Sequence, residues 1–240
     1  MPSDDFLPTN QPASEQQFAV EPDRMKHIDD PDDNGGGSAT DVNGHGKTKR
    51  AFELDGLDDL YRGILEKVGE DVEREGLLKT PARAATAMRF FTQGYSQTLE
   101  ELLNGAIFQE NNNQMVVLRD IEFYSLCEHH LVSFFGKCHI AYIPDGKIVG
   151  VSKMARIVDM FSRRLQVQER MTNQIADAIE CALSPKGVGV IAEGVHLCMI
   201  ARGVEKQHSK MTTSAMRGAF LDLPTRMEML NIIRNGGDVF

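Results

Sequence analysis

The order of helical and strand-like segments constrains the fold of this chain more than any other feature of the sequence. Two groups of apolar, strand-like segments are separated by a pair of amphipathic helices. This order is typical of an α+β fold, in which helices pack on one face of an antiparallel sheet. The predicted strands are residues 115–117, 121–124, 134–143, 188–192, 195–204 and 212–221.

The helical segments have clear start and stop signals. Ser152 is expected to cap the first helix of the central pair, and the Ser-Pro-Lys-Gly sequence at 184–187 ends the second. Upstream, Thr80 is the predicted N-cap of a helix that has Pro81 at its first position. Helices are therefore expected at 54–68, 80–94, in the central pair, and from Pro224 onward.

Length and composition indicate one folded domain with an acidic tail, or two small domains. The chain has 240 residues, 41% of them hydrophobic, which is enough to bury a sizeable core. Residues 1–50 hold ten Asp or Glu residues against five Lys or Arg residues, together with five of the nine prolines. We predict a disordered tail over 1–50 and a folded domain over 51–240, helical over about 54–110 and sheet-containing over about 111–234.

The net charge and the hydropathy pattern exclude several classes of partner. A formal charge of −9 argues against a nucleic-acid-binding protein, and no apolar run is long enough to predict a membrane segment. The four cysteines are unevenly spaced, which does not resemble a disulfide framework. We therefore expect free thiols and a cytoplasmic protein.

Two short motifs carry the types of side chain that zinc prefers. Cys127-Glu128-His129-His130 places a thiol and an imidazole three residues apart, and Cys198 lies far downstream, two residues after His196. Three protein ligands, Cys127, His130 and Cys198, would leave one coordination position for water, as in a catalytic zinc site. In the predicted strand 195–204, His196 and Cys198 would project from the same face.

Other interpretations of these residues were weighed. Cysteine is often a buried core residue, and Cys138 and Cys181 lie in apolar runs without ligand-type spacing, which disfavours a four-ligand structural zinc. A zinc deaminase would need a His-x-Glu motif and a later Pro-Cys-x-x-Cys motif, and both are absent. A redox-active thiol protein would need closely paired cysteines, and the four cysteines of this chain are scattered.

Several motifs, in this order, resemble the GTP cyclohydrolase I family, and in the arginine-rich segment they are more similar to its eukaryotic branch. The resemblance covers about residues 54–234. It rests on Leu78-Lys79-Thr80-Pro81-Ala82-Arg83, Cys127-Glu128-His129-His130-Leu131, Gly150-Val151-Ser152-Lys153, Arg163-Arg164-Leu165-Gln166-Val167-Gln168-Glu169-Arg170, His196-Leu197-Cys198 and Ala201-Arg202-Gly203.

The resemblance implies a zinc-dependent hydrolase that opens the guanine ring of GTP at C8. The products would be formate and 7,8-dihydroneopterin triphosphate, in the first step of pterin biosynthesis. Cys127, His130 and Cys198 would hold Zn²⁺, whose bound water attacks C8, while His129 and His196 transfer protons. Glu169 and Gln168 would recognise guanine. The triphosphate would be bound by Ser152, Lys153, Arg156, Arg202 and Arg83.

The resemblance also implies an assembly. Family members have the tunnelling fold, in which sheets from several subunits join into a barrel, and they are homodecamers with sites between subunits. Animal members bind a feedback regulatory protein, and whether this chain does so is left open. The alternative is a non-catalytic nucleotide-binding or regulatory subunit of the same fold. Such a protein would be expected to lack a zinc ligand or one of the proton-transferring histidines, and this chain has all of them. Arg217 stands where an uncharged residue is expected.

Overall fold

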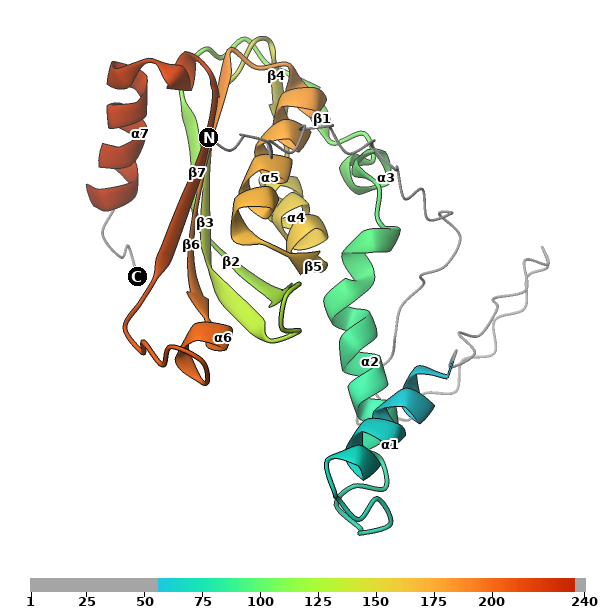
Figure 1. The fold of residues 1–240 in the computed structure, drawn as a ribbon. Helices are drawn as coiled ribbons and strands as arrows, with labels where there is room; N and C mark the ends of the chain where they lie inside the picture. Colours follow the sequence, from blue (N-terminus) through green and yellow to red (C-terminus); the bar gives the residue numbers. More distant parts are fainter. Residues whose placement is uncertain (1–55, 236–240) are drawn as a thin grey trace, which may run out of the picture.

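The computed structural model describes residues 56–235, and these residues form a twisted sheet with helices on both sides (Figure 1). The five-stranded sheet has the order β5-β2-β3-β6-β7. Neighbouring strands are antiparallel except for β5, which runs parallel to β2. The strands are β2 (Val116–Cys127), β3 (Ser133–Ile143), β5 (Leu165–Gln166), β6 (Gly187–His196) and β7 (Met211–Gly218).

The main core lies between the sheet and the two central helices, α4 (Val151–Ser162) and α5 (Gln168–Leu183). Alternate residues of β3 and β6 point into this core, where they meet the apolar faces of both helices. The amphipathic character predicted for the central helices is confirmed by the burial of Met154, Ile157, Val158, Met171, Ile175 and Ile179.

The expectation that helices cover only one face of the sheet is wrong. Helix α7 (Leu223–Asn235) lies on the face opposite α4 and α5 (Figure 1). Its Met229 is buried with Phe220, and with Ala141 and Ile191 from the sheet. Ala141 and Ile191 alternate with residues of the main core, so residues 138–142 of β3 and 187–192 of β6 are buried on both faces of the sheet.

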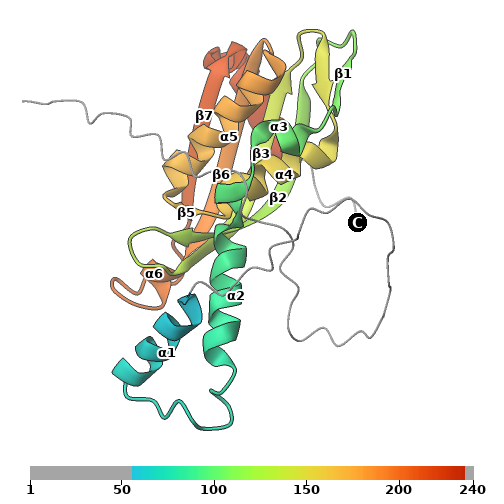
Figure 2. The same ribbon diagram turned by 90° about the vertical axis from the view of Figure 1, so that its right-hand side faces the viewer.

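Two N-terminal helices, α1 (Leu57–Lys67) and α2 (Thr80–Thr92), extend away from the sheet (Figure 2). The 3₁₀ turn η1 (Gln93–Ser96) then leads to α3 (Leu99–Leu103), which packs on the main core, and to β1 (Ile107–Gln109), which pairs with β4 (Lys147–Val149). Gly94 joins this part to α4, because a Cβ there would lie 2.1 Å from the Met160 carbonyl oxygen. The Arg164 guanidinium also donates to the Gly94 carbonyl oxygen (2.8 Å).

Two predicted helix caps are wrong, the first by one position and the second by two. Helix α2 begins at Thr80 itself, with Lys79 at the N-cap, and the Thr80 hydroxyl donates back to the Gly76 carbonyl oxygen. Helix α4 begins at Val151 with Gly150 at the N-cap, so Ser152 lies within the first turn. The hydroxyl groups of both residues were expected to cap the helices, but the structure leaves both N-caps without a side-chain hydrogen bond.

Two strand predictions are also corrected. Residues 116–117 and 121–124 belong to one strand, β2, whose register with β3 shifts between Leu118 and Ile121. Of the strand predicted at 195–204, only residues 195–196 are extended, because β6 ends at His196 and the short helix α6 (Leu197–Ile200) follows. His196 pairs with Phe134, near the first residue of β3, so the chain has no strand to pair with beyond this point.

Some expectations concern other parts of the chain. The predicted tail at 1–50 lies outside the described residues. Across 56–235, no helix has both the length and the apolar character that a bilayer crossing requires. All four cysteines are free thiols, as predicted from their spacing.

Candidate metal and catalytic site

A tight connection between β2 and β3 holds the first two candidate metal ligands. The Cys127 N–H donates to the Val132 carbonyl oxygen (2.9 Å), and the Leu131 N–H donates to the Cys127 carbonyl oxygen (2.8 Å). Leu131 has a φ of 53°, a left-handed conformation that reverses the chain within a few residues. Cys127 is thereby buried at the end of β2, and His130 is exposed beside it.

The structure brings together the three predicted metal ligands. The ligand atoms of Cys127, His130 and Cys198 all lie within 4.8 Å of one another, and Cys127 Sγ is 3.8 Å from His130 Nδ1. Tetrahedral zinc bonded to sulfur and nitrogen at its usual bond lengths separates its ligand atoms by about 3.6 Å. Two sulfurs and one imidazole nitrogen at this spacing fit zinc and leave a fourth position for water.

Cys198 reaches the site from a helix and not, as predicted, from a strand. It lies in α6, directly after the end of β6. Burial raises the pKa of the Cys198 thiol, and the nearby Cys127 sulfur raises this pKa further. Two thiolates this close repel each other unless a cation compensates their charge, and a metal ion would supply that charge.

The two residues before His130 differ in how they are held. The His129 side chain is 62% exposed, and its Nδ1 lies 3.7 Å from Cys127 Sγ, although His129 is not part of the three-ligand group. Glu128 forms a two-armed ion pair with Arg170 of α5, and this hydrogen-bonded pairing lowers the pKa of the Glu128 carboxyl. The Glu128 N–H also donates to the Gln166 carbonyl oxygen (3.1 Å), so the turn is tied to both β5 and α5.

His196 lies in a more enclosed setting. Its ring stacks on Phe134 with the centroids 4.5 Å apart, and its Nε2 lies 2.9 Å from Gln168 Oε1. Burial lowers the pKa of His196, and the Glu169 carboxylate opposes this shift. Glu169 is exposed in the first turn of α5, at the same end of the molecule as the metal ligands.

Gln168 behaves differently from its neighbour Glu169. Its side chain is buried, and its amide nitrogen donates to the carbonyl oxygens of Ala192 and Met211 (3.0 Å each). The family resemblance predicted a guanine contact for Gln168, and it did not predict these hydrogen bonds to the backbone. A signal was available in Gly194, because a Cβ there would lie 2.3 Å from Gln168 Oε1.

The predicted phosphate-binding residues do not all lie near the metal ligands. Ser152, Lys153 and Arg156 lie at the start of α4, where Lys153 Nζ donates to the Leu102 carbonyl oxygen (2.7 Å). Cys127 pairs with Gln166 of β5, just beyond the other end of α4 (Figure 1). The helix rises about 15 Å over the ten residues that follow Ser152.

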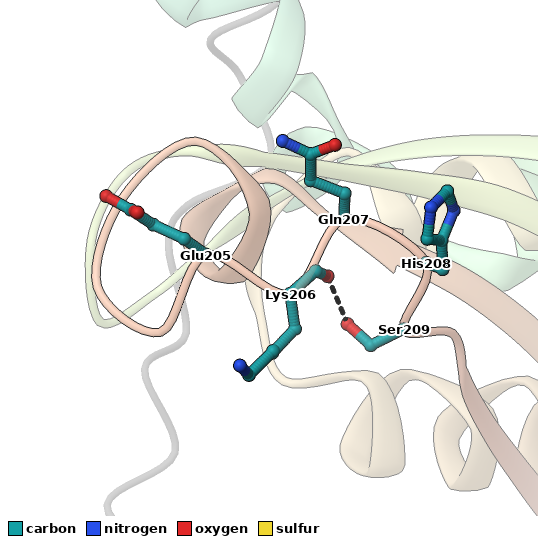
Figure 3. Close-up of a pocket in the computed structure, with 5 residues that line it drawn as sticks. All are labelled: Glu205, Lys206, Gln207, His208 and Ser209. Carbon is teal, nitrogen blue, oxygen red and sulfur yellow. Dashed lines mark hydrogen bonds between the residues drawn. The ribbon is translucent and has the colours of Figure 1, made fainter.

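The two remaining phosphate candidates lie on other elements. Arg202 directly follows α6 and so lies on the metal side, whereas Arg83 lies near the start of α2, in the extended N-terminal part. A surface pocket on the loop after Arg202 is lined by residues 205–209 (Figure 3). The Ser209 hydroxyl donates to the Lys206 carbonyl oxygen there (2.8 Å), and the pocket contains none of the predicted site residues.

Comparison with known proteins gives a consistent result. The family described as GTP cyclohydrolase I matches residues 57–234 of this chain. The chain is 57% identical over 178 residues to the GTP cyclohydrolase 1 of Chromohalobacter salexigens, which covers 74% of this chain and 97% of that protein. It is 59% identical over 178 residues to the GTP cyclohydrolase 1 1 of Pseudomonas aeruginosa, covering 74% and 96%. Both relatives are bacterial, so they lend no support to the expected likeness to the eukaryotic branch.

Proposed function

The chain belongs to the GTP cyclohydrolase I family, and on this basis we propose that it hydrolyses GTP to formate and 7,8-dihydroneopterin triphosphate. The observation that carries the proposal is the cluster of Cys127, His130 and Cys198 beside two further histidines. A non-catalytic member of the fold is disfavoured, because such a protein would be expected to lack a ligand or a proton-transferring histidine.

Cys127, His130 and Cys198 would hold the zinc ion. A bound zinc lowers the pKa of water toward neutrality and so supplies hydroxide for attack at C8 of guanine. His129 is exposed next to the ligand cluster, which suits transfer of a proton to the purine ring. His196 stacks on Phe134, lies two residues before Cys198, and would exchange a proton with the ribose.

Glu169 would supply guanine recognition. A carboxylate accepts two parallel hydrogen bonds, and guanine offers two adjacent donors, N1–H and the exocyclic amine. Glu169 is exposed, close enough to His196 to affect its pKa, and lies in the first turn of α5. The base would therefore lie between the start of α5 and the metal cluster.

The triphosphate would be bound across a subunit boundary. The metal end of the chain is the end of α4 that lies next to Cys127, His130 and Cys198. Ser152 and Lys153 lie about one helix length from it, farther than a lysine side chain reaches, and Arg156 lies midway along α4. A second copy that presents the start of its α4 would complete the site, and Arg83 and Arg202 would add positive charge. This arrangement supports the homodecamer and the sheet barrel of the tunnelling fold. The free cysteines support a cytoplasmic location.

The test is incubation of the purified full chain with GTP while its zinc content is measured. We expect one zinc per chain, release of formate, and a fluorescent neopterin after oxidation and dephosphorylation of the product. ATP is the matched control, because adenine lacks the donor edge that Glu169 would recognise. Bound zinc without formate release would favour the non-catalytic alternative, and absence of zinc would overturn the assignment of the ligand cluster.

A further inference from the structure

We propose that Gln168 is a positioning residue that fixes the tautomer of His196, with the hydrogen on Nε2 and the lone pair on Nδ1. The inference rests on the proposed function, because it concerns the nitrogen that His196 offers to the substrate. It replaces the guanine contact predicted for Gln168 with a role that acts through His196. The geometry of four hydrogen bonds around one buried carboxamide points to this role.

The orientation of the Gln168 carboxamide is set by its acceptors. Its Nε2 lies 3.0 Å from the carbonyl oxygens of both Ala192 and Met211, and a carbonyl oxygen can only accept. A flipped amide would place Oε1 against two carbonyl oxygens and leave them without donors in a buried setting, which is costly. Nε2 therefore faces β6 and β7, and Oε1 faces His196.

The neighbouring hydroxyl groups agree with this orientation. The Thr172 hydroxyl donates its one hydrogen to the Gln168 backbone carbonyl oxygen (2.7 Å). At the 2.7 Å contact between Thr172 and Thr213, the Thr213 hydroxyl must then be the donor. The Thr213 oxygen is left as an acceptor, and Gln168 Nε2 lies 3.2 Å from it. Nε2 has two hydrogens for three acceptors, so one hydrogen is shared, and all three contacts require the same orientation of the carboxamide.

The consequence for His196 follows from the remaining oxygen. Gln168 Oε1 is an acceptor 2.9 Å from His196 Nε2, so Nε2 must carry a hydrogen. In the neutral ring, Nδ1 then has the lone pair and is the nitrogen left to accept a proton from substrate. Stacking on Phe134 fixes the plane of the ring, and Gly194 leaves the room that the carboxamide needs.

Two substitutions separate positioning from simple structural support. Gln168→Met fills the space but removes the acceptor for His196, whereas Gln168→Glu keeps an oxygen acceptor and removes the amide donors. If Gln168 acts through His196, kcat should fall at least 10-fold in the Met variant and less in the Glu variant. Stability should follow the opposite order, because a carboxyl oxygen would face the carbonyl oxygens of Ala192 and Met211. Zinc content and thermal unfolding are measured on both variants.

Gln166→Met is the matched control, since Gln166 is also a buried glutamine but donates its side-chain hydrogen bonds to Phe161 and Gln174. It should lose similar stability with a much smaller change in kcat. Solid-state ¹³C and ¹⁵N spectra of histidine-labelled enzyme, assigned with His196→Asn, should show the Nε2–H form in the wild type and a mixture in Gln168→Met.

Three outcomes would overturn the proposal. They are a wild-type kcat in Gln168→Met, a kcat that merely follows stability, and a raised KM with unchanged kcat, which would return Gln168 to guanine recognition. Absence of formate release by the wild-type enzyme would instead refute the proposed function, and the spectra would still report the tautomer.

Discussion

The two ends of helix α4 differ in what they offer to a substrate. Near its C-terminal end, one chain brings together Cys127, His130 and Cys198 with both candidate proton-transferring histidines. At its N-terminal end, Ser152 and Lys153 lie beside α3 and β1, remote from all of these groups. Under the proposed roles, one chain would carry the metal ligands and the proton-transferring histidines but only part of the phosphate site, so we expect activity to require assembly with a second copy.

The largest effect is expected at the metal end. Cys198→Ala removes one of three ligands, and we expect loss of bound zinc and a fall in turnover of more than about 100-fold, beyond what changes around a metal site usually cost. Metal analysis and formate release check this. The buried Cys138→Ala is the matched control, because it removes a cysteine from the main core without touching the cluster. Full activity in Cys198→Ala would break the three-ligand interpretation.

The comparison between the two ends is tested directly by mixing subunits. Cys198→Ala and Lys153→Ala should each be inactive alone, but hybrids refolded from equal amounts should regain about a quarter of wild-type activity, because half of the metal ends and half of the neighbouring α4 starts are intact. The control mixes Cys198→Ala with the double variant Cys198→Ala/Lys153→Ala. Every subunit of that mixture lacks Cys198, so no complete site can form. Recovery absent from both mixtures would mean that each site uses residues of one chain.

Sequence reasoning predicted the metal end better than the geometry around it. Ligand chemistry and spacing identified Cys127, His130 and Cys198, since few other arrangements of these side chains suit zinc. The strand predicted through Cys198 was wrong because a strand needs a partner, and β3 has only Ser133 left beyond Phe134, which pairs with His196. Periodicity describes one element at a time and carries no information on where its neighbour ends.

The same limitation explains the two residues at the start of α5. Gln168 and Glu169 are adjacent polar residues, and the sequence pattern alone does not distinguish which of them is buried. In the structure the helix turns Glu169 to the surface and Gln168 into the space between α5 and β6, where tertiary contacts decide its role. The one sequence feature that reflects the burial of Gln168 is Gly194, whose missing side chain makes room for the carboxamide.

A smaller effect is expected for guanine recognition at the metal end. Glu169→Ala should raise KM for GTP by about 10- to 100-fold, because hydrogen bonds to a charged group contribute roughly 1.5–3 kcal/mol. Zinc content and thermal stability should not change, since the carboxylate is exposed. Steady-state kinetics with GTP checks this, and Glu180→Ala, an exposed carboxylate near the other end of α5, is the control. A lower kcat at constant KM would assign Glu169 to chemistry and not to binding.

The smallest effect on turnover is expected for the ion pair that joins α5 to the turn carrying Cys127 and His130. Arg170 pairs with Glu128 in that turn, and Arg217 pairs with Asp177 farther along the same helix. Both ion pairs are partly exposed, so Arg170→Met and Arg217→Met should each cost less than about 1 kcal/mol of stability. Only Arg170→Met should slow turnover, by a few-fold, because Glu128 lies between Cys127 and His129 and its release lets the turn move. Urea unfolding and kcat for the two variants measure this; equal losses of kcat would mean that α5 is coupled to the site as a whole and not through the Glu128 pair.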